Sequence, residues 1–195
     1  MSHLIESLEW DEWLNTNSSV VVSIRYSLCG RYIEKDFGAG CEDTAWATYQ
    51  NQLACYQADL CPLRCWPGTA PHRYISEAAE VMDPNTANII FDYAWPDEKT
   101  GYEWEVGSNM EFLAAIQTAE ENGKTWMDVM EDILEHVQEQ GGDTDQAEKF
   151  LTAALTSDLD FSDNHWENVG LFNGELCCID FDTCHNPNAV EYLFT

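Results

Sequence analysis

Apolar residues in the N-terminal half form strand-like runs on either side of one helix-like stretch. The β-branched run 20–26 and the segment 32–37 predict two strands joined by a tight turn. Apolar side chains then recur every three or four residues over 44–58, which predicts an amphipathic helix. Similar spacing over 4–14 predicts a short packed helix at the start of the chain.

Farther along, the pattern predicts two more strands and then a helical part. The segments 74–82 and 88–94 are expected to be strands, the second because of its Ile-Ile-Phe run. Three helices are expected after a polar loop, over 110–122, 125–140 and 145–156. Asn173-Gly174 lies between two apolar runs and predicts a two-residue β-hairpin.

Together these elements predict an α+β protein. Its 195 residues are enough for one well-buried core, so we expect a single domain over 1–195. Within it, a small N-terminal sheet with one helix would occupy 1–95. A helical part ending in a β-hairpin would occupy 96–195.

The charge of the chain is extreme, with 36 acidic residues against 8 basic ones and a formal net charge of −28. Such a field repels nucleic acid and anionic membranes and attracts basic surfaces. We therefore expect no direct binding to nucleic acid or membrane. Halophilic adaptation, solubility and mimicry of a polyanion at a partner's basic groove are three explanations that composition leaves open.

Acidic residues gather on one side of the helix expected over 125–140. Their three- and four-residue spacing places them on one face: Asp128, Glu131, Asp132, Glu135 and Glu139. Like charges so placed destabilise a helix by a few tenths of a kcal/mol per pair. This face is either an ordinary solvated surface or a negative stripe that binds a basic protein partner.

A second group of polar residues lies around the predicted hairpin. Asp163, His165 and Asn168 form a D-x-H-x-x-N pattern, and Asp180 follows within I-D-F-D. Phosphoryl transfer requires a carboxylate near the acceptor hydroxyl, with an Asn and a second Asp to hold divalent metal. The hairpin would bring Asn168 and Asp180 together at its base.

This pattern resembles the catalytic and metal-binding loops of the protein-kinase-like superfamily. The closer likeness is to bacteriophage host-takeover kinases and aminoglycoside-phosphotransferase-like kinases. The resemblance implies a reduced kinase-like fold, with Asp163 as catalytic base and His165 bracing its loop. It further implies that Asn168 and Asp180 bind magnesium and that Lys35 contacts ATP.

Other features of the chain depart from this family. No glycine-rich phosphate loop precedes Lys35, and the helix expected over 44–58 contains no glutamate. We therefore expect a phage- or mobile-element-type protein that binds and inhibits a basic host target, such as a defence or nucleic-acid enzyme. Nucleic-acid mimicry on a divergent kinase-like scaffold would explain its acidity. The alternative is an active phosphotransferase that uses ATP and magnesium; the inhibitor would need no cofactor.

The cysteines and the N-terminus bear on location. The first fifteen residues are acidic and amphipathic, without the apolar run of a secretion signal, so we expect a cytoplasmic protein with reduced thiols. If the chain is phage-encoded, this is the host cytoplasm. Cys61, Cys65 and the Cys184-His185 pair are either zinc ligands or buried free thiols.

Overall fold

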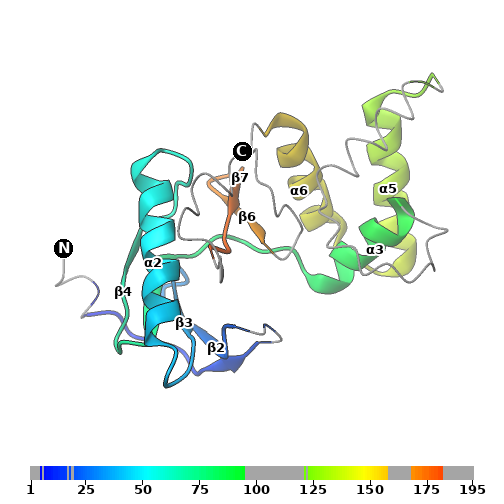
Figure 1. The fold of residues 1–195 in the computed structure, drawn as a ribbon. Helices are drawn as coiled ribbons and strands as arrows, with labels where there is room; N and C mark the ends of the chain where they lie inside the picture. The colour runs from blue at the N-terminus through cyan, green and yellow to red at the C-terminus, as the bar shows by residue number, and fades with distance from the viewer. Residues whose placement is uncertain are drawn as a thin grey trace. The chain divides into compact units, whose positions relative to one another are not determined.

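The computed structural model describes residues 7–16, 20–94, 123–157 and 168–181, together with positions 5, 18 and 121. The described residues form two compact units (Figure 1). The first unit contains the described residues up to Ala79, together with Phe181. The second contains those between Glu80 and Asp180. The class is α+β, as the sequence predicts.

A five-stranded antiparallel sheet forms the first unit, in the order β1-β2-β3-β5-β4. Its strands are β1 (Leu14–Asn15), β2 (Ser23–Tyr26), β3 (Tyr32–Asp36), β4 (Cys65–Pro67) and β5 (Arg73–Glu77). β2 and β3 confirm the predicted pair, and β5 confirms a strand at the start of 74–82. β4 lies inside the proline-rich stretch, at the sheet edge, where a proline removes no necessary hydrogen bond.

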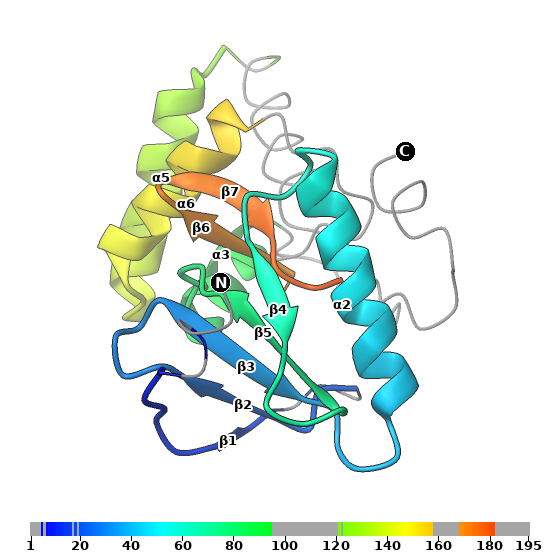
Figure 2. The ribbon, with the colours of Figure 1, turned by 90° about the vertical axis from the view of Figure 1, so that its left-hand side faces the viewer.

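One helix, α2 (Glu42–Gln57), packs along the sheet and confirms the helix expected over 44–58. Figure 2 shows it running beside β4 and β5. Its residues Ala45, Tyr49 and Leu53 contact a small core that includes Tyr74 and Phe37. Tyr74 therefore points to the α2 side of the sheet, which fixes the direction of its neighbours in register.

The helix expected over 4–14 is wrong for most of its length. Trp10 instead forms an isolated antiparallel bridge with Ser27, and Leu14 begins β1, paired with Ile24. Trp13, one of the apolar residues that suggested a helix, lies instead against the Arg25 guanidinium, and so does Trp10. Tertiary contacts with the sheet thus override the local spacing.

The second unit contains three described helices and a β-hairpin. Its elements are α3 (Pro84–Ala94), α5 (Trp126–Gln140), α6 (Thr144–Thr156), β6 (Val169–Phe172) and β7 (Glu175–Cys178). α5 and α6 confirm two of the predicted helices, and Gly141 ends α5 in the left-handed conformation that favours glycine. The hairpin turns at Asn173-Gly174, both with positive φ, as predicted. The helix expected over 110–122 lies outside the described residues, apart from a helical Glu121.

The strand expected over 88–94 is wrong, because this segment is the C-terminal part of α3. Asp83 begins the helix: its side chain accepts a hydrogen bond from Thr86 N at 3.0 Å, and its carbonyl accepts one from Ala87 N. Pro84 occupies the first helical position, where a missing N–H has no consequence. The Ile-Ile-Phe run is therefore recognised as helical only when the preceding Asp83 cap and Pro84 are taken into account.

The core of the second unit is apolar. It includes Ile133 and Val137 from α5, Phe150 and Leu151 from α6, and Val169 from β6, all almost completely buried. This packing fixes the orientation of α5, so that the helix face opposite the core is exposed. No helix in the described part of the chain is both long and apolar enough to cross a membrane.

Three thiols lie near α2 in the first unit. Cys55, Cys61 and Cys65 are buried and unbridged. Burial raises the pKa of Cys61 and Cys65 to about 12 each, and that of Cys55 to about 11. The described residues contain no cluster of His, Cys, Asp and Glu arranged to hold a metal ion. Cys184 and His185 lie outside the described residues.

Candidate functional site

The acidic face predicted on α5 divides in the structure into residues with internal partners and residues that face solvent. Asp128 belongs to the first group, because it forms a capping box with Thr125. Its carboxylate accepts hydrogen bonds from Thr125 N at 2.6 Å and from Thr125 Oγ1 at 2.7 Å. These bonds lower the pKa of Asp128, and the bond from the Thr125 backbone N–H has the larger effect. This residue stabilises the start of the helix.

Asp132 also has an internal partner. Its carboxylate accepts a hydrogen bond from Lys124 Nζ at 2.6 Å, and this bond raises the pKa of Lys124. On the same side of the helix, the rings of His136 and Tyr93 meet at 5.4 Å between centroids. The ion pair with Lys124 thus partly neutralises the charge of Asp132 within the second unit itself.

Glu131, Glu135 and Glu139 form the second group. They follow one another at four-residue spacing and are all exposed. Within the described residues, no lysine or arginine forms an ion pair with any of them. The α5 face thus presents a row of three solvated carboxylates, which we call the glutamate row.

Replacing Thr125 with alanine is expected to lower the free energy of unfolding by about 1 kcal/mol, since it removes the hydroxyl that caps α5. Thermal unfolding at neutral pH would measure this change. The control is Thr152→Ala, at an exposed position of α6, which should leave stability unchanged. The lowered pKa of Asp128 means that its stabilising effect is present above its ordinary pKa. The effect is lost as the pH falls through the lowered value. An unchanged midpoint in Thr125→Ala would contradict the capping role.

Beside the glutamate row lies a groove that the sequence pattern did not single out. Its floor consists of Met127, Met130 and Leu134, and its volume is about 590 Å³. Met127 is 61% exposed, so solvent reaches the apolar part of this groove. Glu131 and Glu135 line the same groove. The spacing i, i+3 and i+7 of the three apolar residues is the sequence signal that would have indicated it.

The base of the hairpin brings Asn168 and Asp180 into one small region, as the sequence predicts. Ile179 N donates to Asn168 O at 2.8 Å, which closes the hairpin beyond the Val169–Cys178 pair. Cys178 Sγ donates to Asp180 O at 2.9 Å. Asn168 is 7% exposed, and Asp180 is half-buried. Amide and carboxylate oxygens are the ligand types that magnesium prefers, so this pair fits the metal chemically.

The other residues of the predicted phosphotransfer site are distributed differently. Asp163 and His165 lie outside the described residues. Lys35 lies on β3 in the first unit, where its register partner is Tyr74, so it points to the α2 side of the sheet. It is half-buried, with Nζ 5.8 Å from the centroid of the Tyr74 ring. Lys35 is therefore not an ordinary exposed strand lysine.

The helix that follows Lys35 along the chain carries a buried amide. Gln52 of α2 is 1% exposed, and its Nε2 donates to Ser76 Oγ at 2.7 Å and to Leu63 O at 3.3 Å. Glu42, the first residue of α2, accepts a hydrogen bond from Gly40 N at 3.2 Å. Bonds from its own backbone N–H and from that of Gly40 lower its pKa.

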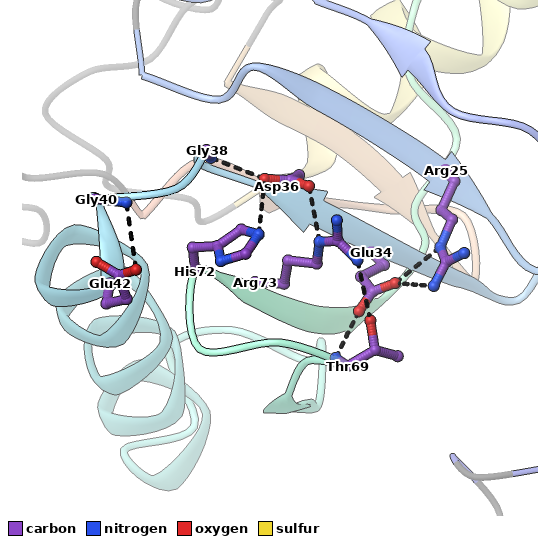
Figure 3. A network of polar contacts seen from close by, with 9 residues as sticks. All are labelled: Arg25, Glu34, Asp36, Gly38, Gly40, Glu42, Thr69, His72 and Arg73. Atoms are coloured by element: carbon purple, nitrogen blue, oxygen red, sulfur yellow. Dashed lines mark hydrogen bonds and ion pairs between the residues drawn. The ribbon is translucent and has the colours of Figure 1, made fainter.

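The opposite face of the sheet holds a buried polar network that sequence reasoning missed (Figure 3). Glu34 is completely buried, and its Oε2 accepts from Arg25 Nε at 2.8 Å while its Oε1 accepts from Thr69 N at 2.6 Å. Asp36 accepts from Arg73 Nε at 2.7 Å and from Gly38 N at 2.7 Å. Both carboxylates are thus neutralised by arginines of neighbouring strands.

Tryptophans cover this network from the N-terminal segment. The Arg25 guanidinium lies 4.9 Å from the Trp10 ring centroid and 4.5 Å from that of Trp13. Arg73 lies 4.6 Å from the same Trp13 ring. Trp13 is therefore held between two arginines, each of which also binds a buried carboxylate. Cation–π contacts of this kind stabilise a fold, and we assign the network a structural role.

No protein-family model, curated protein or solved structure matches this chain. Its function must therefore be argued from the chemistry of its own surfaces. Two regions are candidate functional sites. One is the α5 face with its glutamate row, and the other is the base of the hairpin with Asn168 and Asp180.

Proposed function

We propose that this chain binds a basic protein surface through the glutamate row of α5 and so blocks its target. In the form that the sequence suggests, it is a phage- or mobile-element-type inhibitor of a host defence or nucleic-acid enzyme. The observation that carries the proposal is the division of the acidic face. Asp128 and Asp132 bind groups of their own unit, whereas Glu131, Glu135 and Glu139 point to solvent without a described cation.

Energetics supports this use of the row. Glutamates at i and i+4 repel one another, by a few tenths of a kcal/mol per pair. A basic partner would relieve this repulsion and would also be drawn in by the net charge of −28. The second unit contains two described basic side chains, and both already form ion pairs: Lys124 with Asp132 and Lys149 with Glu80, the latter at 3.6 Å.

Reversing the row is expected to weaken binding about tenfold or more, because it replaces attraction by repulsion at three positions. The triple variant Glu131→Lys, Glu135→Lys, Glu139→Lys would be compared with wild type for capture of bacterial proteins that also bind heparin. For each captured protein, the dissociation constant would be measured at two salt concentrations. Double-stranded DNA should compete, and higher salt should weaken the interaction.

The matched control reverses three exposed acids elsewhere in the second unit. These are Asp145, Glu148 and Glu175, so both triple variants carry the same net charge. The control should bind nearly as well as wild type. Equal losses in both variants would instead mean that the acidity is a general surface property, as in halophilic adaptation. Full binding by the row variant would remove the α5 face from consideration.

A second candidate function, ATP- and magnesium-dependent phosphotransfer, is favoured by the hairpin base. Kinases hold magnesium with an Asn and an Asp and place a lysine on the third strand. At the hairpin base Asn168 is bonded through its carbonyl to Ile179, which directly precedes Asp180, and in the other unit Lys35 lies on β3. A bound magnesium would neutralise phosphate charge. Asn168 and Asp180 would orient that ion.

Calorimetric titration with ATP separates the two functions. We expect no magnesium-dependent binding up to about millimolar ATP, because a net charge of −28 repels the nucleotide and α2 carries Gln52 at its buried face. Magnesium-dependent binding that Asp180→Asn abolishes would establish the phosphotransferase instead. The control for Asp180→Asn is Asp145→Asn, at an exposed position of α6. Asp143 is unsuitable for this purpose because its side chain caps α6.

A further inference from the structure

The groove beside the glutamate row combines an apolar floor with an acidic rim. Met130 and Leu134 rest against the core of the second unit, and Met127 extends the same stripe to the exposed start of α5. Glu131 and Glu135 stand along one edge, and Gln138 lies one turn beyond Leu134. The acidic rim thus borders an apolar stripe that runs from the core of the second unit to the exposed Met127.

The shape and chemistry of the groove restrict what can occupy it. Methionine side chains are unbranched and adapt to varied apolar surfaces. A shallow apolar groove on a helical surface fits the apolar stripe of another helix. The glutamates require that this helix carry lysine or arginine beside its apolar stripe. Nucleic acid is disfavoured by charge, and so is a second copy of this chain, since its α5 would bring the same row of glutamates.

The rest of this chain offers few cations to pair with these glutamates. Outside the described residues, Lys99 is the sole lysine or arginine. Four of the seven described ones are arginines of the first unit, and Arg25 and Arg73 are already bound to Glu34 and Asp36. Charge complementarity therefore points to another protein.

We propose that the α5 groove binds a basic amphipathic helix of a partner protein, with Met127, Met130 and Leu134 receiving its apolar residues and Glu131 and Glu135 pairing with its cations. This proposal rests on the proposed function and specifies the partner's binding element. It also distinguishes this mode from pure nucleic-acid mimicry, in which carboxylates alone would face a basic groove. Binding by this mode depends on where the partner's apolar residues lie, as well as on its charge.

A pair of synthetic peptides tests the groove directly. One is a Leu/Lys peptide of about fourteen residues with leucines at helical spacing, and the other has the same composition with the leucines spread around the helix. Dissociation constants for the full chain would be measured by calorimetry near physiological salt. The amphipathic peptide should bind at least tenfold more tightly than its scrambled counterpart.

Variants then separate the floor from the rim. Met127→Gln combined with Met130→Gln should weaken the amphipathic peptide about tenfold and leave the scrambled one unchanged. Glu131→Lys with Glu135→Lys should weaken both. Val81→Gln, which changes another exposed apolar residue of the second unit, is the matched control and should change neither. Met127→Gln alone, at a largely exposed position, keeps the test valid if the double variant unfolds.

The outcomes distinguish failure of this inference from failure of the proposed function. Equal affinity for both peptides, with no effect of the methionine variants but a loss on charge reversal, would overturn the groove and leave the glutamate row as the binding site. Unchanged affinity in the charge-reversed variant would overturn both. A loss confined to the amphipathic peptide in the methionine variants establishes the groove.

Discussion

Replacing Arg25 with alanine is expected to lower the free energy of unfolding of the first unit by about 3–5 kcal/mol. The substitution leaves the Glu34 carboxylate completely buried without its cation, and a buried unpaired charge is among the most destabilising defects in a protein. It also removes the guanidinium that lies against Trp10 and Trp13. Urea unfolding followed by tryptophan fluorescence would measure the effect, because these rings report on the network itself.

Two further variants identify the cause of this loss. Arg31→Ala removes an exposed arginine of the same unit and should change stability by no more than about 0.5 kcal/mol. Arg25→Met combined with Glu34→Gln removes both charges and keeps an oxygen acceptor for Thr69 N. This double variant should recover much of the lost stability, since a neutral pair needs no compensation. A loss in Arg25→Ala no larger than in Arg31→Ala would show that the buried pair is unimportant.

Replacing Phe181 with alanine should destabilise the first unit by a similar amount, about 3–5 kcal/mol. The residue is completely buried, and truncating its ring removes apolar contacts and leaves a cavity. Its carbonyl accepts a hydrogen bond from Asn51 Nδ2 of α2 at 3.2 Å, and this bond does not depend on the side chain. The effect would therefore report the ring alone, measured by chemical denaturation.

Phe172→Ala provides the comparison for Phe181. Phe172 ends β6 and is half-buried, so its truncation should cost clearly less. If the two variants lose equal stability, the burial of Phe181 does not contribute as proposed. The result bears on function too, because Phe181 directly follows Asp180. A destabilised Phe181→Ala variant would require that any effect of Asp180→Asn on nucleotide binding be checked against folding.

Local sequence signals predicted most of the regular structure. The three- and four-residue spacing of Trp46, Tyr49 and Leu53 suffices for α2, and Asn173-Gly174 suffices for the hairpin because both residues accept positive φ. The two errors have different causes: over 4–14, contacts with the sheet override the helical spacing. Short apolar runs fit both helix and strand, and the choice at 88–94 depended on the Asp83 cap and on Pro84, which precede the run.

The candidate sites were predictable in part. Spacing alone placed the five acids on one face of α5 and brought Asn168 and Asp180 to one hairpin base. It could not indicate that Lys35 would be half-buried on the α2 side, because that depends on its register with Tyr74. It also gave no sign that Glu34 and Asp36 would be interior residues.

By itself, the sequence determined α2, α5, α6 and the hairpin, the strong negative charge and the acidic face of α5, since each depends on composition or on contacts within a few residues. Tertiary structure decided which charges remain available. Asp132 is paired with Lys124, which lies eight residues away. Glu34 is paired with Arg25 on the neighbouring strand and also accepts a hydrogen bond from the backbone N–H of Thr69, thirty-five residues away. Glu131, Glu135 and Glu139 keep their charge exposed. A carboxylate's role depends on which donors the fold brings to it, and for Asp132 and Glu34 those donors lie between eight and thirty-five residues away along the chain.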